Sequence, residues 1–154
     1  MTASAGREVA GGGALHALGL DAILIINVKA FVERRRHVEA QLARFGLAGE
    51  FVHDFDADVI TPELDRHWFA GSELNRGQKS CALKHIAVLE RVVEHGWQHC
   101  LVLEDDVVLA DEFPDGIRAA LAETRDEPRP YVVYLGAGGN FYTPASQREP
   151  GRRI

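Results

Sequence analysis

The sequence predicts an α/β fold in which helices cover a mostly parallel β-sheet. Short apolar runs typical of buried strands alternate with segments whose apolar residues recur at helical spacing. The length of 154 residues suits one domain, and 46% apolar with 26% charged residues is the composition of a globular chain with a real core. These observations exclude a wholly disordered chain.

The charge and the cysteine content exclude further classes of protein. A net charge of −6 repels polyanions, so we expect no nucleic-acid partner. No run of about 18 apolar residues occurs, so we expect no transmembrane segment. Two cysteines, Cys81 and Cys100, are too few for a secreted disulfide scaffold, which favours a cytoplasmic protein.

The chain divides into three parts by composition. Residues 1–21 are rich in Gly and Ala, and charges at Arg7 and Glu8 interrupt them, so we interpret them as a flexible leader rather than a secretory signal. Residues 22–145 carry the alternating pattern and form the folded domain. Residues 146–154 have no apolar periodicity and are expected to be a frayed tail.

The first half of the domain contains two predicted strands and one predicted helix. Ala22–Val28 is a short apolar run of the kind buried on both faces of a sheet. Phe31–Phe45 is expected to be a helix that ends at Gly46. Phe51–Phe55 is predicted to be a second strand, and Thr61–Gly71 an irregular excursion. The apolar face of the helix is expected to comprise Phe31, Val38, Leu42 and Phe45.

The next helix has the clearest boundaries. Asn75 can cap its start, Gln78 three residues later completes a capping box, and Gly96 marks its end. Its expected apolar stripe consists of Ala82, Ile86, Leu89 and Val93.

The last predicted elements are a strand, a helix and a strand. His99–Leu103 is a buried strand that leads directly into an acidic cluster. Asp115–Thr124 is a helix with Pro114 near its start, where the missing N–H costs little. Tyr131–Leu135 is predicted to be a fourth strand of the same sheet. The glycine-rich turn at 136–139 lacks the Lys and Ser or Thr of a phosphate-binding loop, so a plain turn is favoured.

Polar side chains follow three of the predicted strands. In open α/β sheets, ligands bind beyond the carboxyl ends of the strands, and here those ends carry Asn27, Asp54 with Asp56, and the run 104–106 (Glu-Asp-Asp). Adjacent carboxylates repel one another, so a site that keeps them together usually supplies a cation. Oxygen ligands suit Mg²⁺ or Mn²⁺, which typically bridge to substrate phosphates. An acidic turn that faces water is the alternative interpretation.

Other polar residues are weaker candidates by themselves. The run Arg34–Arg36 can contact phosphate, although a charge run on a helix is more often a solvated face. His85 is expected to be a hydrogen-bonded packing residue and Cys81 a small buried apolar one. A zinc site is not favoured, because Cys81, His85, His99 and Cys100 lack a tight pair-and-pair spacing.

Three segments in order resemble glycosyltransferase family 25, the lipooligosaccharide and lipopolysaccharide sugar transferases related to collagen galactosyltransferases. Residues 26–28 (INV) and 33–35 (ERR) match the opening motif, and the run at 104–106 matches the E-D-D motif in full. In the middle motif the matching residues are Leu74, Gly77, Cys81 and His85. Asn75, Gln78 and Lys84 depart from the family's Ser, Glu and Ser.

The resemblance implies a GT-A-like, Rossmann-like fold and a metal-assisted hexosyltransferase. The donor would be a nucleotide sugar, with a UDP-sugar favoured and galactose one candidate, and Mn²⁺ or Mg²⁺ the cofactor. The acceptor would be a glycan or lipid-linked glycan, as in lipopolysaccharide biosynthesis, with peripheral contact at the inner face of the membrane. The implied donor-binding residues are Asn27, Arg34, Arg35, Asp56, His85, Glu104 and Asp105. The implied metal ligands are Glu104 and Asp106, and no residue is assigned as catalytic.

Two other functions and one assembly state are also considered. A non-catalytic nucleotide-sugar-binding or partner module is the alternative to the enzyme. A receiver-like phosphoacceptor domain is disfavoured, because that class places acidic residues after its first strand, where this chain has Asn27. The chain stops soon after the last predicted strand, which predicts an incompletely covered sheet edge and hence a homo-oligomer.

Overall fold

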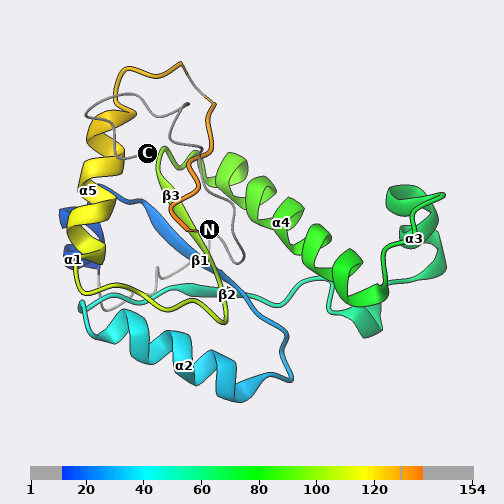
Figure 1. The fold of residues 1–154 in the computed structure, drawn as a ribbon. Helices are drawn as coiled ribbons and strands as arrows, with labels where there is room; N and C mark the ends of the chain where they lie inside the picture. The colour runs from blue at the N-terminus through cyan, green and yellow to red at the C-terminus, as the bar shows by residue number, and fades with distance from the viewer. Residues whose placement is uncertain (1–11, 129, 137–154) are drawn as a thin grey trace, which may run out of the picture. The chain divides into compact units, whose positions relative to one another are not determined.

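The computed structural model describes residues 12–128 and 130–136 of the chain (Figure 1). The chain divides into two compact units, Met1–Leu109 and Ala110–Ile154. The elements in order are α1 (Gly12–Ala17), β1 (Ala22–Ile26), α2 (Val32–Ala43), β2 (Glu50–Val52), the 3₁₀ turn η1 (Ala57–Val59), α3 (Pro62–Phe69), α4 (Arg76–His95), β3 (Cys100–Glu104) and α5 (Phe113–Glu123).

The sheet confirms the α/β class. It has three parallel strands in the order β2-β1-β3, so β1 lies in the middle and is buried along its whole length. In the register, Leu24 of β1 lies opposite Glu50 of β2 and Val102 of β3. All three carboxyl ends therefore meet at one edge of the sheet, and this edge is where the polar groups gather.

Helices cover both faces of this sheet. The core on the α4 face contains Leu24, Ile26, Val52, Ala87 and Val88, with Cys100 and Val102 packed against it. Because side chains alternate along a strand, Ile23 and Ile25 point to the other face. There α2 lies alongside the sheet (Figure 1) and buries Val38 and Leu42, two of the four residues predicted for its apolar face.

The predicted boundaries of α4 are confirmed. The Asn75 side chain accepts a hydrogen bond from the backbone of Gln78, and the Gln78 side chain accepts one from the backbone of Asn75, which makes the expected capping box. Gly96 ends the helix with a φ of +67°, a left-handed conformation that glycine adopts without strain.

The predicted apolar stripe of α4 is wrong. The buried face consists of Ser80, Leu83, Lys84, Ala87 and Val88. Leu89 and Val93, predicted to be in the core, are 57% and 81% exposed. Hydrogen bonds and ion pairs, which a hydropathy pattern does not include, hold this polar face of α4 against the core. The Ser80 hydroxyl donates a hydrogen bond of 2.7 Å to the carbonyl of Phe55. The buried Lys84 ammonium likewise forms an ion pair with Asp56.

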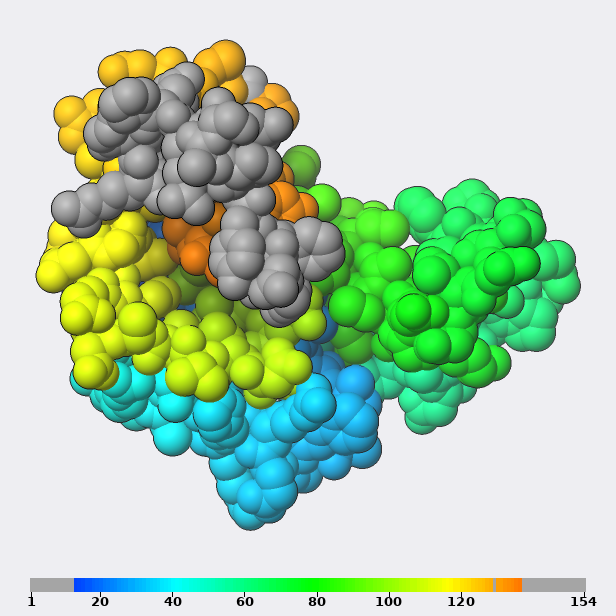
Figure 2. Space-filling model, in the orientation of Figure 1, coloured from blue at the N-terminus to red at the C-terminus, as the bar shows by residue number. Residues whose placement is uncertain are grey.

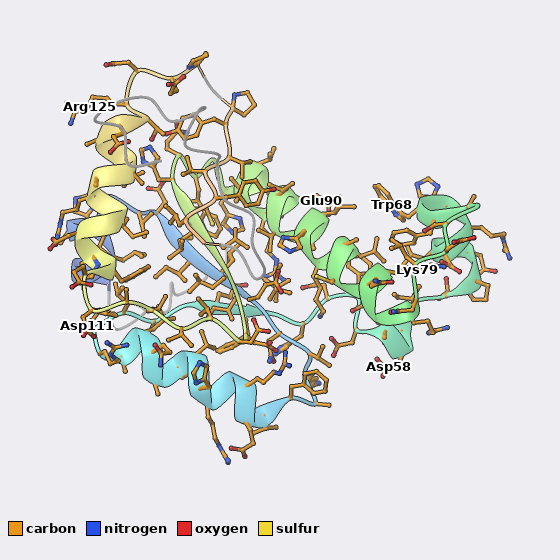
Figure 3. All side chains as sticks on the ribbon, in the orientation of Figure 1. Asp58, Trp68, Lys79, Glu90, Asp111 and Arg125 are labelled. Atoms are coloured by element: carbon orange, nitrogen blue, oxygen red, sulfur yellow. The ribbon has the colours of Figure 1, made fainter. Side chains whose placement is uncertain are left out.

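The segment predicted to be irregular forms α3. Thr61 caps it by accepting a hydrogen bond from the Leu64 backbone, and a proline stands in its first turn, so the helix start was readable from the sequence. Figure 2 shows α3 and the start of α4 as a green lobe, separated by an indentation from the blue and cyan surface near α2. Lys79, labelled near Trp68 in Figure 3, joins the two helices through an ion pair of 2.6 Å with Asp65.

Two predicted strands also differ from the structure. The second strand ends at Val52 and not at Phe55, whose φ of +58° a strand does not permit. Tyr131–Leu135 forms no strand, and Val132 and Tyr134 are 72% and 86% exposed. A strand needs a partner to accept its backbone hydrogen bonds, and pairing within the described residues involves β1, β2 and β3 alone.

Three further observations bear on the domain organisation. Within the segment 1–21, Gly12–Ala17 form α1, and both Leu18 and Leu20 are buried. The predicted helix at 115–124 is present as α5, which buries Ile117 and Ala120. Among the described residues, none of the helices has the length and apolar content needed to cross a membrane. Residues 137–154, including the predicted tail, lie outside the described part.

Candidate functional site

The three consecutive carboxylates at the end of β3 have different surroundings. The side chain of Asp105 is 8% exposed, whereas those of Glu104 and Asp106 are 58% and 64% exposed. Side chains alternate along a strand, so Glu104 points to the face that carries α4 and Asp105 to the face that carries α2. The sequence predicted one acidic cluster, and the pleat of the strand divides it.

Asp105 is held in a buried hydrogen-bond network. Its Oδ2 accepts from the side-chain amide of Asn27 at 2.7 Å, and its Oδ1 accepts from the Arg34 guanidinium at 3.0 Å. Asn27 is 2% exposed, and its Oδ1 accepts a hydrogen bond of 3.0 Å from His53. Burial and the charge of Lys84 lower the pKa of His53, which favours the neutral ring in this network. These bonds tie the ends of β1 and β3 together.

Arg34 links the buried network to the surface. Its side chain is 52% exposed, and the same Nη1 that bonds Asp105 lies 3.7 Å from Asp106. The guanidinium also stacks over the Phe31 ring, 5.4 Å from its centroid. The hydrogen bond to Asp105, followed by its charge, raises the pKa of Arg34, so the cation is permanent. Residues 30–34 line an open depression beside it.

Arg35, the other predicted phosphate ligand, has different partners. It is paired with Glu39 at 3.0 Å and stacks over the Phe51 ring, 5.1 Å from the centroid. Consecutive helical residues point about 100° apart, so two neighbouring arginines cannot share one set of contacts. Arg34 is therefore the arginine that the structure joins to the acidic run.

Asp56 and Lys84 form a buried ion pair that the sequence did not predict. The Lys84 side chain is 1% exposed, and its Nζ lies 2.7 Å from Asp56 Oδ1 and 3.5 Å from the carbonyl of Val52. Asp56 Oδ2 accepts from the backbone N–H of Lys29 at 3.0 Å. Burial raises the pKa of Asp56, but the bonds from Lys84 and Lys29 outweigh that effect and leave it below the ordinary 3.8. Both carboxylate oxygens of Asp56 are therefore engaged in contacts within the protein.

The exposed side of the strand end brings Glu104 to α4. His85 Nε2 lies 3.7 Å from Glu104 Oε1, and Cys81 stands one turn earlier on the same helix. Ligand atoms of these three side chains lie within 4.8 Å of one another. Burial, and next the charge of Glu104, raise the pKa of the Cys81 thiol.

The structure thus brings together most of the residues predicted from the sequence. Glu104, Asp105 and Asp106 share the strand end, Asn27 and Arg34 contact it from the α2 side, and His85 contacts it from α4. Sequence reasoning missed Lys84 and His53. The hydropathy pattern offered no signal for Lys84, because the predicted apolar stripe of α4 lies on a different face from the one that the structure buries.

The two exposed carboxylates of the run, Glu104 and Asp106, are the groups that could hold a hard divalent cation. Glu104 lies beside His85 of α4 and Asp106 beside Arg34 of α2, and their exposure leaves room for water and phosphate oxygens around such an ion. Asp105 is already bonded to Asn27 and Arg34, so its role is to hold Arg34 in place. The arrangement can bind a diphosphate through a metal on one side and through Arg34 on the other.

Comparisons with known proteins confirm the resemblance found in the motifs. A family model described as glycosyltransferase family 25 (LPS biosynthesis protein) matches residues 20–134, which include β1, α4 and the acidic run. A Drosophila melanogaster protein described as a glycosyltransferase 25 family member is 25% identical over 130 residues. That match covers 77% of this chain and 21% of the relative, so the chain spans about a fifth of that protein's length.

Proposed function

Because this chain belongs to glycosyltransferase family 25, we propose that it transfers a hexose from a nucleotide-sugar donor to a glycan acceptor. The observation that carries the proposal is the exposed pair Glu104 and Asp106 beside the half-exposed Arg34. Two carboxylates and one arginine at the carboxyl ends of parallel strands are the groups that a metal-bound diphosphate requires.

The roles of the individual residues follow from their burial. Glu104 and Asp106 would hold Mn²⁺ or Mg²⁺, which when bound neutralises the charge that develops on the departing nucleoside diphosphate. Arg34 would contact the diphosphate directly with its exposed N–H groups. Asn27 and Asp105 are buried and bonded to each other, so they position Arg34 rather than contact the donor.

The remaining predicted donor ligands take supporting roles. Asp56 holds the backbone of Lys29, in the loop between β1 and α2 that lies next to the proposed diphosphate position. His85 lies beside Glu104 and can donate a hydrogen bond to that carboxylate or to a donor oxygen. The Arg35 guanidinium stacks over the ring of Phe51 in β2, so Arg35 would support the neighbouring strand rather than contact the donor.

We further propose a UDP-sugar as donor, with galactose one candidate sugar, and a glycan or lipid-linked glycan as acceptor. The family that the chain matches is described as an LPS biosynthesis family, which supports an acceptor of this kind. A protein that acts on a lipid-linked glycan would work at the membrane surface, and we propose the cytoplasmic face of the membrane for this chain.

A thermal-shift screen of nucleotide sugars, with and without Mn²⁺, tests the proposal. A donor that binds the folded state alone raises the melting temperature, by an amount that grows with the logarithm of the donor concentration divided by its Kd. We expect a UDP-sugar to raise it only when Mn²⁺ is present, and the same donor to be hydrolysed or transferred. Binding without turnover would assign the chain to the non-catalytic nucleotide-sugar-binding class. A failure of every donor to shift the melting temperature would contradict both functions.

A further inference from the structure

The α4 side of the strand end carries a second set of ligand atoms. Cys81 and His85 are four residues apart on α4, so they lie one above the other on one helical face. Glu104 reaches the same point from the end of β3, with its carboxylate 3.7 Å from the His85 ring nitrogen. Among residues 12–128 and 130–136, these are the three side chains whose potential metal-ligand atoms lie close to one another.

The three ligand atoms differ in kind from those of the proposed donor site. A thiolate, an imidazole nitrogen and one carboxylate oxygen are the ligands that Zn²⁺ and related transition metals prefer, whereas Mg²⁺ takes oxygen ligands. Asp106, the other carboxylate of the proposed donor site, lies near the Arg34 guanidinium instead. The two sides are thus suited to different cations.

The separation of the ligand atoms is close to what zinc requires. With metal–ligand distances of about 2.0 to 2.3 Å and tetrahedral angles, neighbouring ligand atoms lie about 3.3 to 3.6 Å apart. The atoms here lie within 4.8 Å of one another, and the side chains of His85 and Glu104 are 46% and 58% exposed. Exposed side chains rotate at little cost, so the small contraction needed is within their reach.

We propose that Cys81, His85 and Glu104 form a binding site for Zn²⁺ or a similar transition metal. The Cys81 thiol would lose its proton to solvent as the sulfur–metal bond forms, and His85 would bind through its neutral ring. Three protein ligands leave a fourth position for water or for an oxygen of a bound molecule. The site shares Glu104 with the proposed donor site but uses neither Asp106 nor Arg34, so metal binding at Cys81 and His85 can be tested whether or not the chain is a transferase.

Titration of the metal-free 154-residue chain with Co²⁺ alone, and in parallel with Zn²⁺ by calorimetry, tests this site. We expect a thiolate-to-cobalt charge-transfer band that saturates at one equivalent and disappears when Zn²⁺ is added. Cys81→Ser should abolish the band, and His85→Gln should weaken Zn²⁺ binding by more than about tenfold. The melting temperature of each metal-free variant shows whether it is folded.

Two matched variants serve as controls. Cys100→Ser removes the other cysteine, which lies partly buried on β3, and His95→Gln removes another exposed histidine of α4. Neither should alter the cobalt band or the Zn²⁺ affinity. Absence of the band in the wild-type chain, or equal Zn²⁺ affinities for Cys81→Ser and Cys100→Ser, would overturn the proposal.

The same variants separate this site from the donor site. Asp106→Asn should leave Zn²⁺ binding unchanged, because Asp106 is not one of its ligands. Cys81→Ser should leave the Mn²⁺-dependent binding of UDP unchanged. If Asp106→Asn weakens Zn²⁺ binding as much as Cys81→Ser does, the ion is held by the acidic run and the separate site does not exist.

Discussion

Two sets of polar side chains at the carboxyl end of the sheet differ in burial and in what surrounds them. The inner set is bonded to other groups of the chain and consists of Asn27, Asp56, Lys84 and Asp105. The outer set is more exposed and consists of Cys81, His85, Glu104 and Asp106. Asp105 belongs to the first set and its two neighbours to the second. The comparison teaches that proximity in sequence does not predict a shared role, because the strand pleat sends adjacent carboxylates to different environments.

The inner set should determine stability and the outer set ligand binding. A buried charge without its partner is costly, whereas an exposed charge is solvated whether or not it is paired. Substitutions in the inner set should therefore lower the free energy of unfolding, and those in the outer set should lower affinity while the fold persists.

The largest effect is expected for Lys84→Met. The substitution keeps most of the buried stem but leaves the Asp56 carboxylate without its cation, so it should lower the free energy of unfolding by about 3 to 5 kcal/mol. Urea denaturation followed by circular dichroism measures the change. The double variant Lys84→Met/Asp56→Asn removes the uncompensated charge and should recover part of the loss. If Lys84→Met alone is as stable as the wild type, the ion pair between Lys84 and Asp56 does not stabilise the fold.

Asp105→Ala should have the next largest effect. It leaves the buried amide of Asn27 without an acceptor and removes the anchor of Arg34, which should lower the free energy of unfolding by about 2 to 3 kcal/mol. Asp106→Ala is the matched control and should change it by less than about 0.5 kcal/mol. Equal losses for the two variants, measured in the same urea titrations, would erase the distinction between the two sets.

The pH dependence of stability sharpens the same comparison. The pKa of Asp56 lies below its ordinary value of 3.8, because the bonds from Lys84 and Lys29 outweigh burial. A depressed pKa contributes stability that is present above the ordinary value and is lost as the pH falls through the value in the folded state. In Lys84→Met, burial raises the pKa of Asp56 without the opposing effect of the lysine. The advantage of the wild type should therefore be constant near neutral pH, begin to shrink as the pH falls through the higher pKa of Asp56 in the variant, and shrink further until the lowered pKa in the wild type is passed. Unfolding measured at a series of pH values checks this; an advantage that persists in acid would show that Asp56 is not the group that Lys84 stabilises.

Much of the fold could be predicted from the sequence because local chemistry determines it. The capping box at Asn75, the stop at Gly96 and the apolar runs of β1 and β3 are properties of neighbouring residues, and each of these elements is confirmed. The run Tyr131–Leu135 has an equally apolar pattern but forms no strand. A strand depends on a partner elsewhere in the chain, and its own residues cannot show whether one exists.

The candidate site was predictable in position but not in its internal arrangement. The rule that ligands bind at the ends of parallel strands located Asn27 and the acidic run. The pairing of Lys84 with Asp56 and the approach of Glu104 to His85 connect residues 28 and 19 positions apart, and no periodicity encodes them. Cys81 was expected to be a buried apolar residue, and its place beside two other ligand atoms became visible only in the folded chain.

Calorimetric titration with UDP, with and without Mn²⁺, tests most directly the claim that the outer carboxylates bind a metal-bound diphosphate. Asp106→Asn keeps the shape of the side chain but removes its charge, and should weaken Mn²⁺-dependent UDP binding by about tenfold or more, about 1.4 kcal/mol, with little effect on unfolding. Asp58→Asn is the control, since Asp58 is an exposed aspartate of η1 (Figure 3) and should bind UDP like the wild type. Equal UDP affinities for Asp106→Asn and Asp58→Asn in the presence of Mn²⁺ would contradict the account.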